Sequence, residues 1–135
     1  MKAKILLRIA AVLMLLHTAG HTMGALTWKE APNARVAAVI NGMQTEHFNF
    51  MGRSVSLGSF FDGYGFTNIG VLLLLTILLW LLSTEPNRKF LLLTGLFLLF
   101  MGIIELIYFF PLAAIISLLA GICTLLAYFL WKPSH

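Results

Sequence analysis

The chain has 135 residues, of which 60% are hydrophobic and only 10% are charged. A soluble domain carries about 25% charged residues, and a chain this short offers too little interior to hide so many apolar side chains from water. The composition therefore excludes an ordinary soluble protein and predicts a chain whose apolar surface is covered by a lipid bilayer.

The net charge of +4 does not indicate nucleic-acid binding, because the chain has no basic patch or recognition motif. A single cysteine, Cys123, excludes an intramolecular disulfide and any Cys-x-x-Cys site. The basic residues instead flank or enter apolar segments, at Lys2, Lys4, Arg8, Arg88, Lys89 and Lys132. We therefore expect the bilayer, and no nucleic acid, as a partner.

Four apolar segments are long enough to cross a bilayer, which takes about 20 residues. They cover residues 5–26, 60–82, 90–110 and 111–131. The last two cannot be one helix, because 44 residues at about 1.5 Å each would span roughly 66 Å, against a hydrocarbon core of about 30 Å. Pro111 marks the turn between them, since proline at the first position of a helix costs no hydrogen bond.

The positive-inside rule orients these spans. Lys2 and Lys4 precede the first span, Arg88 and Lys89 lie in the loop 83–89 between the second and third, and Lys132 follows the last. Both termini are therefore predicted to be cytoplasmic, and the first loop and the turn at Tyr108 to lie outside. A cleaved signal peptide remains an alternative for the first span, because basic residues and an apolar run precede small residues at 18–20.

The first loop is predicted to hold an amphipathic helix at residues 32–51, on the outer surface of the membrane. Pro32 would open it and Gly52 would end it. One helical face recurs at spacings of three and four residues, at Val36, Ile40, Met43, His47 and Phe50. An irregular loop is the alternative.

Polar side chains within spans cost several kcal/mol unless they are paired or wetted. Because neighbouring spans run in opposite directions, the ionisable residues of the spans fall in the same, outer half, except Arg8, whose long side chain can reach the opposite interface. We expect one polar pocket there. In the alternative that these residues only pin the helices together, Arg53 and Asp62 would form an ion pair that holds the loop onto the second span. The candidate ligand-binding residues are His17, His21, His47, Arg53, Asp62, Asn68, Glu105 and Tyr108.

Helical spacing supports this pocket. His17 and His21 are four residues apart and share a face, which Gly20 and Gly24 continue as a packing surface. A small and polar stripe in the last span is interpreted as packing alone, at Ala113, Ser117, Gly121, Thr124 and Tyr128.

The pocket admits several interpretations. His17 and His21, with Glu105 as a third ligand and Asp62 or His47 as a fourth, would suit a divalent metal. Glu105 with either span histidine would suit acid–base catalysis, so whether the chain is an enzyme stays open. The leading hypothesis is the binding of a small amphipathic or lipid-like molecule. Helix pinning, or a role as a structural accessory subunit of a membrane complex, is the remaining alternative.

Four segments carry a resemblance to a family of small bacterial four-span membrane proteins without an assigned activity. They are Gly-His-Thr-Met-Gly at 20–24, Phe-Asn-Phe-Met-Gly-Arg-Ser at 48–54, Phe-Phe-Asp-Gly-Tyr-Gly-Phe at 60–66 and Tyr-Phe-Phe-Pro at 108–111. The chain departs from the family pattern around Arg53 and Asp62. The resemblance implies a bacterial inner membrane and four spans. It assigns no catalytic role to any residue.

Together these features predict an all-α fold. We expect a single membrane domain over residues 1–135, built as a four-helix bundle with an extracytoplasmic amphipathic helix between the first two spans.

Overall fold

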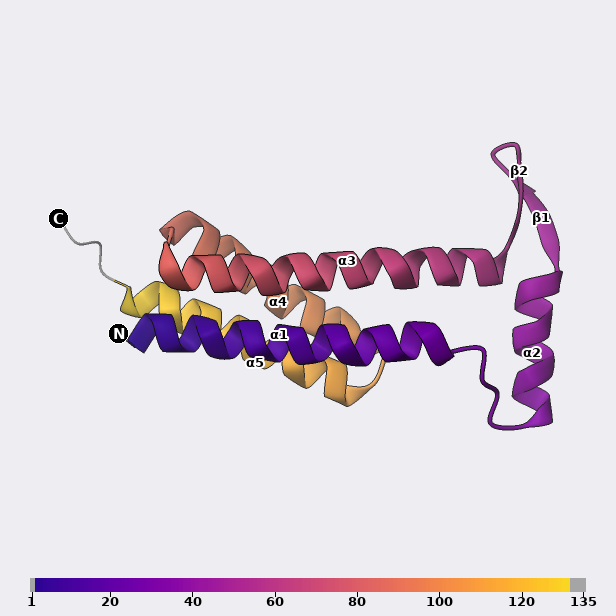
Figure 1. The fold of residues 1–135 in the computed structure, drawn as a ribbon, viewed down its shortest axis with the longest axis horizontal. Helices are drawn as coiled ribbons and strands as arrows, with labels where there is room; N and C mark the ends of the chain where they lie inside the picture. The colour runs from indigo at the N-terminus through magenta and orange to yellow at the C-terminus, as the bar shows by residue number, and fades with distance from the viewer. Residues whose placement is uncertain (1, 132–135) are drawn as a thin grey trace. The chain divides into compact units, whose positions relative to one another are not determined.

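A computed structural model describes residues 2–131. Over these residues the chain forms five helices and one two-stranded sheet (Figure 1). The elements in chain order are α1 (Lys2–Thr27), α2 (Ala34–Thr45), β1 (His47–Phe50), β2 (Arg53–Ser56), α3 (Leu57–Thr84), α4 (Arg88–Tyr108) and α5 (Pro111–Leu130). The fold is therefore mostly helical, as expected, with one β-hairpin that the sequence analysis did not predict. Lys132 lies outside the described residues.

The elements group into two compact units. The first unit contains the chain up to Thr18 and from Val71 onward, and the second contains Ala19–Gly70. Helices α1 and α3 each contribute one part to each unit. The single membrane domain expected over residues 1–135 stays a prediction.

Four of the helices, α1, α3, α4 and α5, are long and apolar enough to cross a membrane. The shortest, α5, has 20 residues, which at about 1.5 Å per residue is about 30 Å. That length matches the hydrocarbon core of a bilayer. The predicted number of apolar helices is confirmed, and their bounds differ from the prediction by three residues or fewer. These helices indicate a multi-pass membrane protein.

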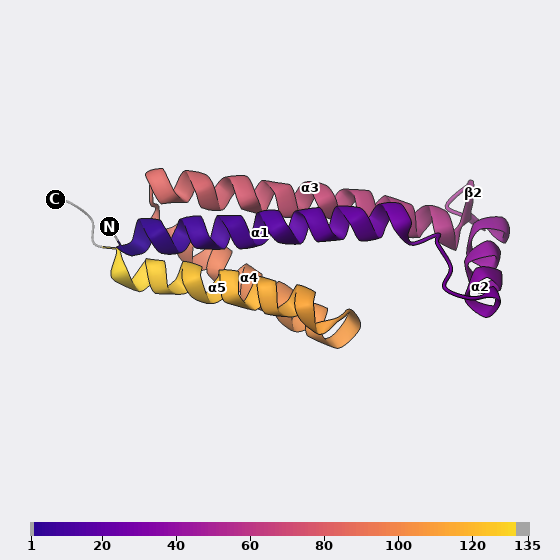
Figure 2. The ribbon, with the colours of Figure 1, turned by 60° about the horizontal axis from the view of Figure 1, so that its bottom comes forward.

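Within the first unit, α4 and α5 form an antiparallel hairpin (Figures 1 and 2). The sharp turn exists because Pro111 begins α5 as predicted, after only Phe109 and Phe110. The two helices approach closely where glycine on one faces leucine on the other. The pairs run in opposite directions along the two helices: Gly95 with Leu125, Leu99 with Gly121, and Gly102 with Leu118.

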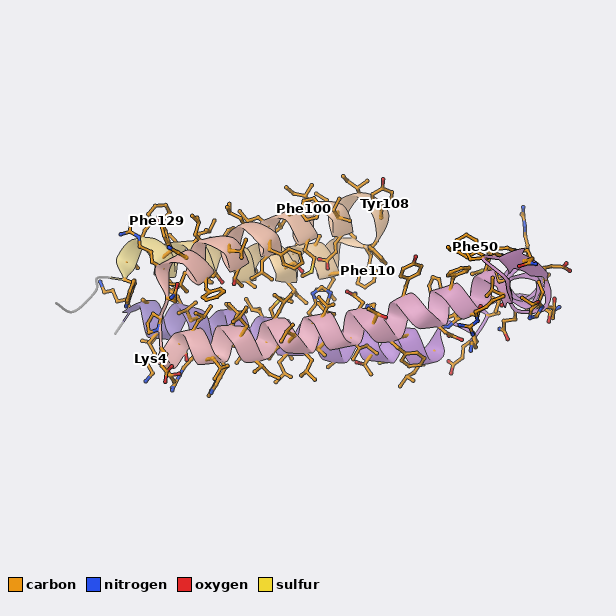
Figure 3. All side chains as sticks on the ribbon, turned by 90° about the horizontal axis from the view of Figure 1, so that it is seen from above. Lys4, Phe50, Phe100, Tyr108, Phe110 and Phe129 are labelled. Atoms are coloured by element: carbon orange, nitrogen blue, oxygen red, sulfur yellow. The ribbon has the colours of Figure 1, made fainter. Side chains whose placement is uncertain are left out.

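The core of the first unit combines leucines with a stripe of small residues on α5. The small residues recur every three or four positions, so one face of α5 is almost free of bulk. Large apolar side chains point away from the unit instead, as Phe100, Tyr108 and Phe129 do in Figure 3. An apolar exterior of this kind fits lipid rather than water. The buried leucines and methionine are Leu7, Met14, Leu72, Leu75, Leu79, Leu82, Leu91 and Leu98.

In the second unit, the loop helix predicted at residues 32–51 is shorter than expected. Helix α2 begins after Asn33, whose side chain accepts a hydrogen bond from the Val36 amide at 3.0 Å. Val36, Ile40 and Met43 lie half-buried on one face, as predicted. The helix ends at Thr45, however, and residues 47–50 and 53–56 form the hairpin.

The turn of this hairpin explains the error. Met51 and Gly52 have positive φ angles of 51° and 83°, as the type I′ turn of a two-residue hairpin requires at both central positions. Gly52 therefore makes a strand turn and does not end a helix. Consequently His47 and Phe50 lie on a strand, and Phe50 pairs with Arg53 across it.

Candidate buried polar site

A buried polar site joins three helices of the first unit. His17 of α1, Glu105 of α4 and Ser117 of α5 are each at most 7% exposed. The Ser117 Oγ lies 3.1 Å from His17 Nδ1, and His17 Nε2 lies 3.5 Å from the Glu105 Oε1. The histidine thus stands between a hydroxyl and a carboxyl group.

The proton positions depend on the state of Glu105. An ionised carboxylate only accepts hydrogen bonds, so with Glu105 ionised His17 Nε2 carries the proton that points toward it. The Ser117 hydroxyl then has two acceptors within reach, His17 Nδ1 and the Glu105 carboxylate. The 3.5 Å separation between Nε2 and Oε1 is longer than a strong hydrogen bond. The contact is an ion pair when the imidazole is protonated and the carboxyl group is ionised.

The second oxygen of Glu105 stands out. Its Oε2 atom is buried and accepts no hydrogen bond from residues 2–131. Leaving a buried acceptor without a donor costs about 1–3 kcal/mol, more when the group is charged. This oxygen is a position where a further donor would be stabilised.

A separate polar cluster lies in the second unit. The His21 Nε2 is 3.1 Å from the Gly65 carbonyl oxygen and 3.4 Å from the Asn68 side-chain nitrogen. Because a carbonyl oxygen only accepts, His21 Nε2 donates to Gly65. This bond ties the end of α1 to the start of α3. Gly65 allows the approach, since a Cβ there would lie 3.3 Å from the Ala25 Cβ.

Asp62 is held by two donors in the same unit. The Trp28 indole nitrogen donates to Oδ1 at 2.7 Å, and the Lys29 ammonium donates to Oδ2 at 2.8 Å. The alternative partner considered from the sequence, Arg53, lies exposed on β2. Lys29 and Trp28 take its place, because they follow α1 directly and meet the first turns of α3.

The predicted ligand-binding set therefore falls into separate groups. His17 and Glu105 come together in the first unit, while His21, Asn68 and Asp62 belong to the second unit. The other three predicted ligand-binding residues have exposed side chains: His47 on β1, Arg53 on β2 and Tyr108 at the end of α4. Among residues 2–131, no group of three or more His, Cys, Asp or Glu side chains is placed to hold a metal ion.

Two of the predicted packing features also change. A Cβ added at Gly20 or Gly24 would meet no atom within 4 Å, so these glycines are not the close contacts predicted. Ser117, interpreted as packing, belongs to the polar site. Its position four residues before Gly121, on the small face of α5, was the available signal.

Comparison of the chain with protein-family models, curated protein sequences and solved structures gives no match. The class defined by the fold is a multi-pass membrane helical protein.

Proposed function

We propose that the protein binds the polar end of a small amphipathic or lipid-like molecule at Glu105. The observation that carries this proposal is the buried Oε2 atom, which lacks a donor among residues 2–131. A hydroxyl or amine group of the ligand would supply that donor. The apolar remainder of the molecule would pack among the exposed leucine and phenylalanine side chains of α4 and α5.

The placement of this site in the bilayer follows from charge. Figure 3 places Lys4 and Phe129 at one end of the first unit, and Tyr108 and Phe110 at the other end of the α4–α5 hairpin. The basic end is proposed to be cytoplasmic. Glu105 lies three residues before the end of α4, near the aromatic turn. The site is thus proposed to open toward the outer leaflet, in a bacterial inner membrane.

The orientation can be tested by cysteine labelling. In a Cys123→Ala background, Ala38→Cys on α2 is expected to react with a membrane-impermeant maleimide in intact cells. Glu85→Cys, between α3 and α4, is expected to react only after permeabilisation, because its loop carries Arg88 and Lys89. The reverse pattern would show that the proposed orientation is inverted.

Ligand binding can be tested on the purified protein by mass spectrometry of extracted small molecules. The wild type is expected to carry an amphipathic compound with a donor group beyond bulk lipid. Glu105→Gln is expected to retain about tenfold less, since hydrogen bonds to charged groups contribute about 1.5–3 kcal/mol. Glu46→Gln changes an exposed carboxylate and is the matched control. Equal extracts from all three proteins would refute the proposal.

Acyl transfer is a second candidate, favoured by the order of the three side chains. In serine hydrolases a serine nucleophile, a histidine base and an orienting carboxylate follow one another in this order. Here the corresponding side chains are those of Ser117, His17 and Glu105. The Ser117 oxygen would bond to the acyl carbon while His17 takes its proton and passes it to the leaving group. A fluorophosphonate probe is then expected to label the wild type and Ser83→Ala, a buried serine elsewhere, but not Ser117→Ala. An unlabelled wild type would exclude this candidate.

A further inference from the structure

An apolar groove lies between the first part of α1 and the last part of α3, within the first unit. Its volume is about 220 Å³, and its lining is apolar apart from one threonine. Ligand pockets for drug-sized molecules hold about 300–1,000 Å³, so this groove has room for a segment of a chain and not for a whole lipid. The lining residues are Ala11, Val12, Leu15, Thr76, Ile77, Trp80 and Leu81.

A cation stands at the edge of this groove. The Arg8 guanidinium carbon lies 5.1 Å from the ring centroid of Trp80, which itself lines the groove. Stacking on an indole face leaves the edge of a guanidinium available to hydrogen-bond acceptors. Among residues 2–131, no carboxylate forms an ion pair with Arg8.

The helical segments that flank the groove carry basic and no acidic residues, and Glu85 lies just beyond the end of α3. Lys4 lies one helical turn before it, so the two side chains share a face of α1 with Val12. The segments 2–18 and 71–84 contain no acidic residue. Arg8 is the seventh residue of α1, about 10 Å from its start, so its long side chain can reach the headgroup region.

We propose that this groove is a binding site for an anionic phospholipid. One acyl chain would lie along Val12, Ile77 and Trp80, and the phosphate would accept hydrogen bonds from the Arg8 guanidinium, a geometry that favours arginine. Basic residues near the cytoplasmic leaflet attract anionic lipid, which selects a phospholipid as the occupant. This inference needs α1 and α3 to face lipid, and it does not depend on a ligand at Glu105.

The test uses full-length protein in nanodiscs of equal parts phosphatidylcholine and phosphatidylglycerol, released for native mass spectrometry. The wild type is expected to retain phosphatidylglycerol selectively. Arg8→Gln is expected to retain about tenfold less, as expected for loss of a charged hydrogen bond. Val12→Trp, which fills the groove and leaves every charge in place, is expected to lose the lipid as well.

Arg88→Gln is the matched control, because Arg88 also stacks on an aromatic ring, that of Tyr128 at 4.8 Å. It is expected to retain lipid like the wild type. Equal loss in Arg88→Gln and Arg8→Gln would overturn the proposal, since general charge attraction would then suffice. Retention in Arg8→Gln would also overturn it. Because Arg8 is exposed, circular dichroism of Arg8→Gln should match the wild type, and this variant decides the test if Val12→Trp does not fold.

Discussion

His17→Leu is expected to lower the free energy of unfolding by about 3 kcal/mol, because removing one member of a buried pair leaves the other buried and unpaired. The unpaired group here is Glu105, which is 7% exposed and already has one oxygen without a donor. The measurement is SDS-induced unfolding in mixed micelles, followed by circular dichroism.

The double variant His17→Leu with Glu105→Leu is expected to recover most of this loss. Replacing both members of a buried pair with apolar side chains of similar size is often neutral or stabilising. Ser117 can then donate to a carbonyl of its own helix, as Thr124 does to Ala120 at 2.7 Å. His47→Leu, on the exposed strand β1, should leave stability unchanged. If the two single losses add in the double variant, the two side chains are not coupled.

Gly121→Ala is expected to destabilise the α4–α5 hairpin. A Cβ at this position would lie 3.0 Å from the backbone nitrogen of Leu99 and 2.9 Å from its Cδ2. The leucine side chain can turn away, but the backbone of α4 must move. Overpacking of this kind costs about 1–3 kcal/mol, which outweighs the gain of about 1 kcal/mol from replacing a helical glycine.

Gly20→Ala is the matched control, because no atom lies within 4 Å of a Cβ added there. It should be as stable as the wild type or slightly more stable, so the two variants are expected to differ by about 2 kcal/mol. Thermal unfolding in detergent can compare them directly. Equal stability of the two alanine variants would show that α4 and α5 are not in close contact at Gly121.

The helical part of this fold was predictable because lipid-crossing helices are recognised from length and apolar content alone. Pro111 also located the turn between α4 and α5. The β-hairpin was not predictable in the same way. His47 and Phe50 continued the helical spacing of α2 by coincidence, and a glycine after an apolar run fits either a helix end or a strand turn.

The polar site was predictable in its residue types and not in its partners. Glu105 and His17 were predicted as site residues because ionisable groups in apolar helices require a polar partner or water. Which groups supply it depends on helix rotation and register, and these are set by contacts such as Gly102 with Leu118. Lys29 was not predicted as a partner of Asp62 because it lies outside the predicted spans. Ser117 was interpreted as packing because a small polar residue on a helix face can serve either packing or hydrogen bonding.

The short turn before Pro111 has a consequence for how the protein is made. Since α4 and α5 are separated by two residues only, their contacts join positions close together in the chain, and such local contacts form quickly. In a bilayer, a hairpin of this kind assembles in a second stage, after both helices have inserted. Helix α1 is synthesised before α4 and α5, so its contacts with them cannot form until they are complete. Its buried His17 meets Glu105 and Ser117 only when the last helix has left the ribosome.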